Sequence, residues 1–254
     1  MIFAIDVGNT HLVAGCLDGS GAHYVGRFET DLETTAEEYA IKFKCWLDIN
    51  EVDCKSLEGG IISTVVPPLI SPLVRAIQYL IGKKPLVVGP GVKSGLNIKI
   101  DNPAQLGADM VAGAAASLHK YPVPQIVFDL GTATTASVID KKECFRGVVI
   151  LPGVRTALAA LSEHTSQLPH IDLTAPKHVI GTNTIDSMRS GSVLGTAAMM
   201  DGIAERIEEE LGERATLIAT GGLAAAVIPY CRRKFIQDDH LLLDGLWLIY
   251  QKNQ

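Results

Sequence analysis

The sequence predicts an α/β protein built from two related halves. Apolar runs typical of buried strands alternate along the chain with amphipathic segments typical of helices. A strand–turn–strand pattern also occurs twice, as IFAIDVGNTHLVAGCLD (2–18) and IVFDLGTATTASVID (126–140), with Asp6 and Asp129 at matching positions about half the chain apart. We therefore expect two domains of similar architecture, residues 1–120 and 121–254.

Each repeat places an Asp near the end of an apolar strand, followed by a Gly and small polar residues. A carboxylate at the end of a buried strand is costly unless a cation or hydrogen-bond donors meet it, and Gly permits a close approach of the backbone to a ligand. Asn9, Thr10 and the segment 132–134 offer hydroxyls and N–H groups suited to phosphate oxygens, while the carboxylates suit Mg²⁺. Two ordinary hairpin turns are the alternative, which the duplication disfavours.

The remaining elements follow in order from local signals. Thr34 or Thr35 can cap a helix with Glu37 and Glu38 near its positive end, and Pro103 suits a helix start. The expected helices are 34–48, 69–82, 101–119, the second part of 146–161, a long helix within 181–211, and 241–253. The expected strands outside the repeats are 60–66, 85–89, the first part of 146–161, and 216–223.

Composition excludes several classes of protein. The chain has 254 residues, 47% of them hydrophobic, and a net charge of −6, which argues against disorder and against a main role in nucleic-acid binding. We expect no membrane segment and no secretory signal. The five scattered cysteines favour a reduced, cytoplasmic protein over a disulfide scaffold or zinc site. The motif G-x-x-x-x-G-K-[ST] is absent from the sequence, so the chain is not expected to be a P-loop protein.

Two further features are open to both a functional and a structural interpretation. Asp109 interrupts an apolar, Ala-rich helix, where it is either a solvated surface carboxylate or a functional group. Gly221 and Gly222 follow a buried strand and would let an adenine ring or another backbone lie close; an ordinary strand-to-helix turn is the alternative.

Taken together, the motifs resemble those of the type III pantothenate kinases, also called the Bvg accessory factor family, of the acetate kinase, sugar kinase, Hsp70 and actin superfamily. The resemblance spans nearly the whole chain. It rests on IDVGNTHLVAG, DNPAQLGAD, FDLGTATT, LPGV, IGTNTIDSMRSG, ATGGLA and LLLDGLWLIY. It implies two ribonuclease-H-like (actin-like ATPase) halves with a nucleotide cleft between them, a homodimer, ATP, Mg²⁺ and a monovalent cation, K⁺ or NH₄⁺.

The resemblance also implies roles for individual residues. Asp109 matches the family's catalytic base, Asp6 would hold Mg²⁺, and Asp129 would lie near the monovalent cation. The nucleotide would be bound by Asp6, Gly8, Asn9, Thr10, Gly131, Thr132, Ala133, Thr134, Gly221 and Gly222. The pantothenate site would include Ile100, Gly107, Ala108, Asp109, Met110 and Thr184, the last reaching it from the other subunit.

The acceptor side departs from the family pattern. Ile100 and Met110 stand where the family usually has Tyr and Arg, and Arg146 where it often has Gly. Arg makes forked contacts with a carboxylate and Met does not, a loss of about 10- to 150-fold in affinity. The first expectation is a kinase that phosphorylates pantothenate with ATP, the first step of coenzyme A synthesis. The alternatives are a kinase-fold paralogue with a changed acceptor and a non-catalytic nucleotide-binding or regulatory protein.

Overall fold

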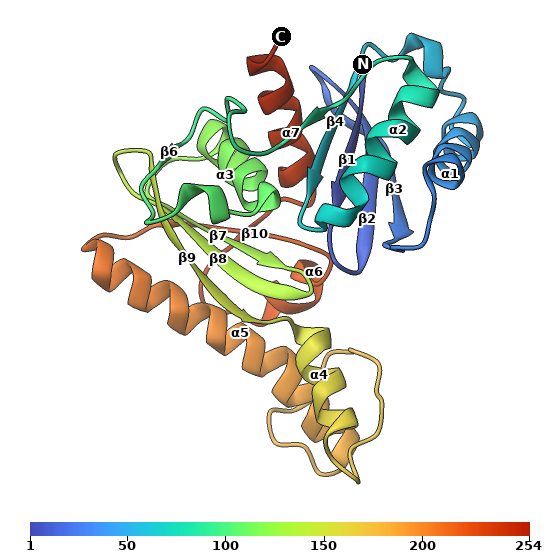
Figure 1. The fold of residues 1–254 in the computed structure, drawn as a ribbon. Helices are drawn as coiled ribbons and strands as arrows, with labels where there is room; N and C mark the ends of the chain where they lie inside the picture. The colour runs from blue at the N-terminus through green and yellow to red at the C-terminus, as the bar shows by residue number, and fades with distance from the viewer. The chain divides into compact units, whose positions relative to one another are not determined.

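The computed structural model describes residues 1–254, and contacts divide the chain into two compact units (Figure 1). Unit 1 contains residues 1–96, 101–116 and 240–254. Unit 2 contains residues 97–100 and 117–239.

The boundary between these units lies after residue 116 rather than after residue 120, and two further segments belong to a different unit from the one expected. The C-terminal segment 240–254 belongs to unit 1, because its apolar side chains are buried with those of the N-terminal sheet. The short segment 97–100 belongs to unit 2, because Asn97 and Ile98 pair with a strand of that unit. Both differences arise from contacts between residues distant in sequence.

Unit 1 is built on a five-stranded sheet with the strand order β3-β2-β1-β4-β5. Strand β1 is central, pairing antiparallel with β2 and parallel with β4. The strands are β1 Ile2–Val7, β2 His11–Asp18, β3 Gly21–Glu29, β4 Gly60–Thr64 and β5 Leu86–Val87.

Helices cover both faces of this sheet (Figure 1). Phe3, Ile5 and Val7 of β1 are buried with apolar residues of α1 and α2, whereas Ile2 and Ala4 are buried with those of α3 and α7. Because side chains alternate along a strand, Asp6 faces the α3 and α7 side. The elements are α1 Ala36–Ile49, α2 Ile70–Ile81, α3 Ala108–Lys120, α7 Leu241–Lys252 and the 3₁₀ turns η1 Cys54–Ser56, η2 Pro67–Leu69 and η3 Pro103–Gln105.

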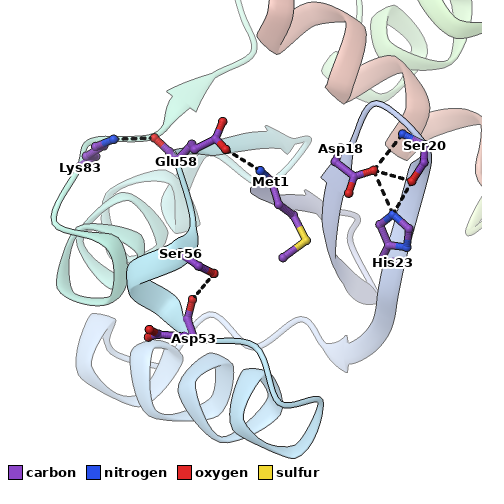
Figure 2. Close-up of polar contacts among 8 residues, drawn as sticks. All are labelled: Met1, Asp18, Ser20, His23, Asp53, Ser56, Glu58 and Lys83. Atoms are coloured by element: carbon purple, nitrogen blue, oxygen red, sulfur yellow. Dashed lines mark hydrogen bonds and ion pairs between the residues drawn. The ribbon is translucent and has the colours of Figure 1, made fainter.

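Polar contacts within unit 1 stabilise the start of the chain and the β2–β3 hairpin (Figure 2). The N-terminal ammonium of Met1 lies 2.9 Å from the Glu58 carboxylate, and Lys83 Nζ donates to the Glu58 carbonyl at 2.8 Å. Asp18 Oδ1 accepts from the Ser20 hydroxyl at 2.7 Å and lies 3.0 Å from His23 Nε2. These contacts fix β1 beside β4 and close the turn after β2.

Unit 2 repeats this arrangement of strands. Its sheet has the order β11-β10-β7-β8-β9-β6, and the central β7 again pairs antiparallel with the next strand and parallel with a later one, β10. The strands are β6 Asn97–Ile98, β7 Gln125–Leu130, β8 Ala133–Ile139, β9 Cys144–Pro152, β10 Thr216–Thr220 and β11 Ile236–Gln237. Read from β9 to β11, the order matches that of β3 to β5.

The long helix α5 packs across one face of the second sheet (Figure 1). Ile126, Phe128 and Leu130 of β7 are buried against it and α6. The helices of this unit are α4 Val154–Glu163, α5 Thr184–Leu211 and α6 Ala224–Val227, followed by the 3₁₀ turn η4 Ile228–Tyr230. None of the helices of the chain combines the length and the apolar character that crossing a membrane requires.

A buried carboxylate holds α5 to the segment that precedes β11. Glu208, 6% exposed, accepts from both terminal nitrogens of Arg233 at 2.7 and 2.9 Å and from Arg214 at 2.8 Å. Burial alone would raise the pKa of Glu208, but the hydrogen bonds from Arg233, the Ala215 N–H and Arg214 outweigh it and lower the pKa to about 2.

The predicted strands and helices are confirmed, with shifted ends. Thr35 rather than Thr34 caps α1, in a reciprocal capping box with Glu38. The helix expected over 101–119 begins only at Ala108, because Pro103 starts a separate 3₁₀ turn capped by Asn102. The strand expected over 216–223 ends at Thr220, where Gly221 adopts a positive φ of 92°.

Candidate functional site

The first predicted loop is the turn between β1 and β2, in unit 1. Gly8 N–H donates to the His11 carbonyl at 2.9 Å, and the Thr30 hydroxyl donates to the Gly8 carbonyl at 2.7 Å. Asn9 and Thr10, at the tip, are exposed. A Cβ at Gly8 would lie 3.2 Å from the His11 carbonyl oxygen, so the tight turn favours Gly. The turn is held by the backbone and by Thr30, which leaves the tip accessible to a ligand.

Asp6 lies one residue before the end of β1 and is half-buried. Its register partners are Val13 on β2 and Ser63 on β4. Because register partners in a ladder share a face, the side chains of Asp6 and Ser63 lie on the same side of the sheet, the side on which α3 packs.

Asp109 is the second residue of α3, the helix that packs on this face of the sheet. Its Oδ1 accepts from the Met110 N–H at 2.7 Å. Burial raises the pKa of Asp109, and this backbone hydrogen bond only partly opposes the rise. Gly107 lies directly against the carboxylate, where an added Cβ would collide with Oδ1. The lack of a side chain at position 107 therefore leaves room for the Asp109 carboxylate in this position.

The second predicted loop is the turn between β7 and β8, in unit 2. Gly131, Thr132 and Ala133 are exposed, and Gly131 N–H donates to the Ala133 carbonyl at 3.1 Å. The Thr156 hydroxyl of α4 donates to the Thr132 carbonyl at 2.7 Å. Gly153 approaches the Gly131 and Thr132 carbonyls so closely that a Cβ would overlap them. The turn is therefore supported by the start of α4, through the Thr156 hydrogen bond and the close packing of Gly153.

Asp129 occupies in β7 the place that Asp6 occupies in β1. Its register partners are Thr135 on β8 and Thr220 on β10, so these two hydroxyl residues share its face of the sheet. Gly221 follows Thr220, and a Cβ there would collide with the Asp129 carboxylate and the Leu130 N–H. The chain that carries the predicted Gly221-Gly222 pair therefore passes directly beside Asp129.

Thr134 lies on the opposite face of the second sheet from Asp129. It pairs with Leu130, is fully buried, and its hydroxyl has no hydrogen-bond partner. Of the two neighbouring threonines, Thr135 shares the face of the carboxylate. Thr134 lies on the face of the sheet that packs against α5.

The remaining predicted residues differ in their surroundings. Met110 is half-buried, with its terminal methyl next to Gly107, and Ala108 is buried in the core between the sheet and α3. Ile100 belongs to the short segment of unit 2 and is half-buried, while Thr184 is exposed as the first residue of α5. Arg146, which departs from the family pattern, pairs with Asp140 at 3.1 Å across the β8–β9 turn.

The chain contains no group of three or more His, Cys, Asp or Glu side chains arranged to hold a metal ion. Asp6 and Asp129 each stand as the carboxylate of a separate hairpin, with oxygen-bearing neighbours on the same face. One carboxylate plus hydroxyl, water and phosphate oxygens suits a cation that binds together with a nucleotide rather than in an all-protein cage.

Sequence reasoning alone missed the residues that support the two loops. Thr30 and Thr156 each hold a turn carbonyl, and Ser63, Thr135 and Thr220 flank the two carboxylates. The polar residues inside the apolar runs GIISTVV and TLIAT were the available signal, but their partners are set by strand register.

Comparison with known proteins identifies the family of this chain. The sequence model of the family described as type III pantothenate kinase matches residues 2–206. The chain belongs to the type III pantothenate kinase family. Two proteins named type III pantothenate kinase, from Exiguobacterium sp. (strain ATCC BAA-1283 / AT1b) and Exiguobacterium sibiricum, are 44% and 41% identical to it over the full length of each.

Solved structures support the fold. A Baf family protein from Campylobacter jejuni aligns with a TM-score of 0.61 at 19% identity, covering 99% of this chain and 98% of that one. An ROK hexokinase from Thermus thermophilus aligns with a TM-score of 0.53 at 14% identity, covering 99% and 98%. This member of the family therefore has an α/β fold with two sheets, which aligns with the folds of those structures over nearly its whole length.

Proposed function

We propose that this kinase transfers the γ-phosphoryl group of ATP to the primary hydroxyl of pantothenate, giving 4′-phosphopantothenate in the first step of coenzyme A synthesis. The observation that carries the proposal is Asp109, a half-buried carboxylate that accepts from the Met110 N–H at the start of a helix that packs on the Asp6 face of the sheet. Family membership supplies the substrate class.

Asp109 acts as the general base in this proposal. Phosphoryl transfer depends mainly on alignment and charge compensation, so the carboxylate orients the acceptor hydroxyl and takes its proton late in the transfer. A raised pKa makes Asp109 a stronger proton acceptor than an ordinary Asp. Since the base must be ionised, activity is lost as the pH falls through this raised pKa, at a higher pH than for an unperturbed Asp.

The first turn binds the phosphates and a divalent cation. Asp6 supplies a carboxylate oxygen for Mg²⁺, and Gly8, Asn9 and Thr10 offer N–H, amide and hydroxyl groups to the phosphate oxygens. Mg²⁺, when bound with ATP, neutralises the charge that develops on the transferring phosphoryl group.

The second turn supplies further phosphate contacts. Gly131, Thr132 and Ala133 present exposed backbone groups, and the family resemblance assigns Thr134, the next residue, to the same phosphate loop. Asp129 holds the monovalent cation, K⁺ or NH₄⁺, and Gly221 with Gly222 lets the nucleotide pass close to the backbone. The positive φ of Gly221 and its contact with Asp129 support this assignment.

The acceptor site comprises Gly107, Ala108, Asp109 and Met110, with Ile100 and with Thr184 from a second subunit. The half-buried Met110 favours a second candidate, the same phosphoryl transfer to an alcohol that lacks the pantothenate carboxylate, because Met offers that carboxylate no charge. Replacing Met110 by Arg together with Ile100 by Tyr separates the two. A fall in KM for pantothenate supports the first candidate, and no change supports the second.

A homodimer and a cytoplasmic location complete the proposal. Unit 2 exposes several large apolar side chains, the kind of surface that a second copy covers. They are Ile150, Leu161, Val179, Ile180 and Ile185. Sedimentation that gives twice the mass of 27.1 kDa supports the dimer, and sedimentation as a monomer at working concentration contradicts it.

Asp109→Asn tests the catalytic assignment. We expect kcat to fall by roughly 10²- to 10⁴-fold while calorimetry shows nearly unchanged ATP binding. The variant should also be at least as stable as the wild type at pH 7, because a buried Asp with a raised pKa destabilises the folded state where it is ionised. Wild-type turnover by the variant would remove Asp109 from this role.

A further inference from the structure

Ser63 is a buried polar residue that the proposed chemistry leaves unused. It precedes the last residue of β4, its exposure is 0%, and its hydroxyl has no hydrogen-bond partner. A hydroxyl buried without a partner destabilises the folded state. Packing alone would therefore favour Ala at this position.

The position of Ser63 links it to Asp6. The two residues are register partners in the parallel β1–β4 ladder, so their side chains lie next to each other on one face of the sheet. Their neighbours one pair earlier on this face, Ala4 and Ile61, are buried in the apolar core with α3 and α7. Asp6 and Ser63 thus form the polar end of an otherwise apolar face.

The same pairing recurs in unit 2. Thr220 of β10 is the parallel register partner of Asp129 and is also buried, at 7% exposure. Since β10 holds the place in its sheet that β4 holds in the other, a hydroxyl residue stands beside the hairpin carboxylate in both units. The other buried, unpartnered hydroxyl, that of Thr134, faces away from Asp129.

We propose that Ser63 is a positioning residue for Asp6, donating a hydrogen bond to the Asp6 carboxylate when a divalent cation and nucleotide are held there. A Ser hydroxyl rotates freely and has one proton to donate, so it can fix which carboxylate oxygen faces the cation. Partners of this kind orient metal-binding carboxylates in many sites. The inference rests on the proposed binding of the cation by Asp6.

Ser63→Ala tests the inference, with Ile61→Val as the matched control on the same strand and face. The probe is Mn²⁺ with a nonhydrolysable ATP analogue, titrated by calorimetry. For Ser63→Ala we expect an affinity for Mn²⁺ about 10-fold weaker and a Tm about 2–4 °C higher without ligand, because the unpartnered hydroxyl is removed. Ile61→Val should lower the Tm and leave the Mn²⁺ affinity unchanged.

A second variant separates positioning from packing. Ser63→Thr keeps the hydroxyl and should hold the Mn²⁺ affinity within about threefold of wild type, whereas Ser63→Cys, a weak donor of similar size, should resemble Ser63→Ala. The KM for pantothenate should stay the same in Ser63→Ala. Unchanged Mn²⁺ affinity in Ser63→Ala, or a loss of affinity that accompanies a lower Tm as in a packing defect, would overturn the inference.

The failure of the proposed function gives a different result. If the wild-type chain binds Mn²⁺ and the analogue but releases no ADP with pantothenate, the acceptor assignment fails and the role of Ser63 stands. If turnover is normal and Ser63→Ala binds Mn²⁺ like the wild type, the role of Ser63 fails and the kinase assignment stands.

Discussion

The two hairpins that carry Asp6 and Asp129 have the same topology but different surroundings. Beside Asp6 the neighbouring parallel strand contributes Ser63 and continues as Thr64. Beside Asp129 the equivalent strand ends at Thr220, and Gly221 then turns against the carboxylate with a positive φ of 92°. Each carboxylate has a hydroxyl residue as its parallel register partner, and Asp129 also has the backbone of Gly221 close to it.

This difference shows how a duplicated hairpin can serve two purposes. A carboxylate without a glycine turn against it leaves room for a hydrated divalent cation, which keeps several of its waters. A carboxylate packed against a glycine turn suits close backbone contact with a nucleotide. The loops are also supported differently, by Thr30 from β3's end in unit 1 and by Thr156 from α4 in unit 2.

The largest expected effect comes from neutralising each of the two carboxylates in turn. Asp6→Asn should lower kcat/KM for MgATP about a thousandfold, or about 4 kcal/mol, and raise the Mg²⁺ concentration needed for half-maximal rate. Asp129→Asn should leave the Mg²⁺ requirement unchanged and remove stimulation by K⁺. Initial rates over Mg²⁺ and K⁺ series check both expectations, and identical cation profiles for the two variants would contradict the division of roles.

The buried ion network of Glu208 makes the stability of unit 2 sensitive to acid. The pKa of Glu208 is lowered to about 2, so its stabilisation is complete above its ordinary pKa near 4.5 and is lost as the pH falls from about 4.5 towards 2. Glu208→Gln should destabilise the chain by about 3 kcal/mol at pH 7, measured by urea unfolding. The difference from wild type should shrink below pH 4.

The exposed ion pair of Arg75 with Glu37 in unit 1 is the control for Glu208. Both side chains are more than half exposed, so Glu37→Gln should change stability far less than Glu208→Gln at any pH. An equal loss of stability in Glu37→Gln and Glu208→Gln would show that the contribution of Glu208 to stability does not depend on its burial.

A substitution at Gly221 tests whether the backbone at this position packs closely against the Asp129 carboxylate. Gly221→Ala should destabilise the chain by about 2–3 kcal/mol, since the positive φ is strained for Ala and the new methyl group overlaps the Asp129 carboxylate. Gly212, with a φ of 73° and open space around it, is the matched control. Gly212→Ala should cost only the conformational strain, about 1 kcal/mol, and equal losses would remove the contact with Asp129 from the account.

Gly107 provides the smallest and most local test, in unit 1. Gly107→Ala should displace the Asp109 carboxylate and lower kcat about tenfold, with a small change in Tm. Gly113, in the helix α3 that follows, has room for a methyl group. Gly113→Ala should stabilise the chain by about 0.5–1 kcal/mol and leave kcat unchanged, whereas equal kcat in both variants would contradict the proposed contact.

The parts of the fold and site that are encoded locally could be predicted from the sequence. The two strand–turn–strand repeats and the capped helix after Thr35 are determined by residues adjacent in the chain, and the structure confirms them. The interruption at Pro103 shortened the next predicted helix, because Asn102 caps a separate turn there.

Other features depend on register and on packing between distant segments. The pairing of Asp6 with Ser63 joins strands about 55 residues apart and cannot be read from either segment. The C-terminal helix α7 belongs to unit 1 because Leu243 and Leu246 fill its core, which its position in the sequence does not reveal. The face of Thr134 could have been inferred from the alternation along β8, with Leu130 as its partner.

The most direct test of the account is ADP release by the wild-type chain with MgATP and pantothenate, with and without K⁺. We predict ADP formation that requires pantothenate, equals the 4′-phosphopantothenate formed, and increases with K⁺. ATP binding without pantothenate-dependent ADP release would contradict the proposal that this kinase phosphorylates pantothenate with Asp109 as the general base.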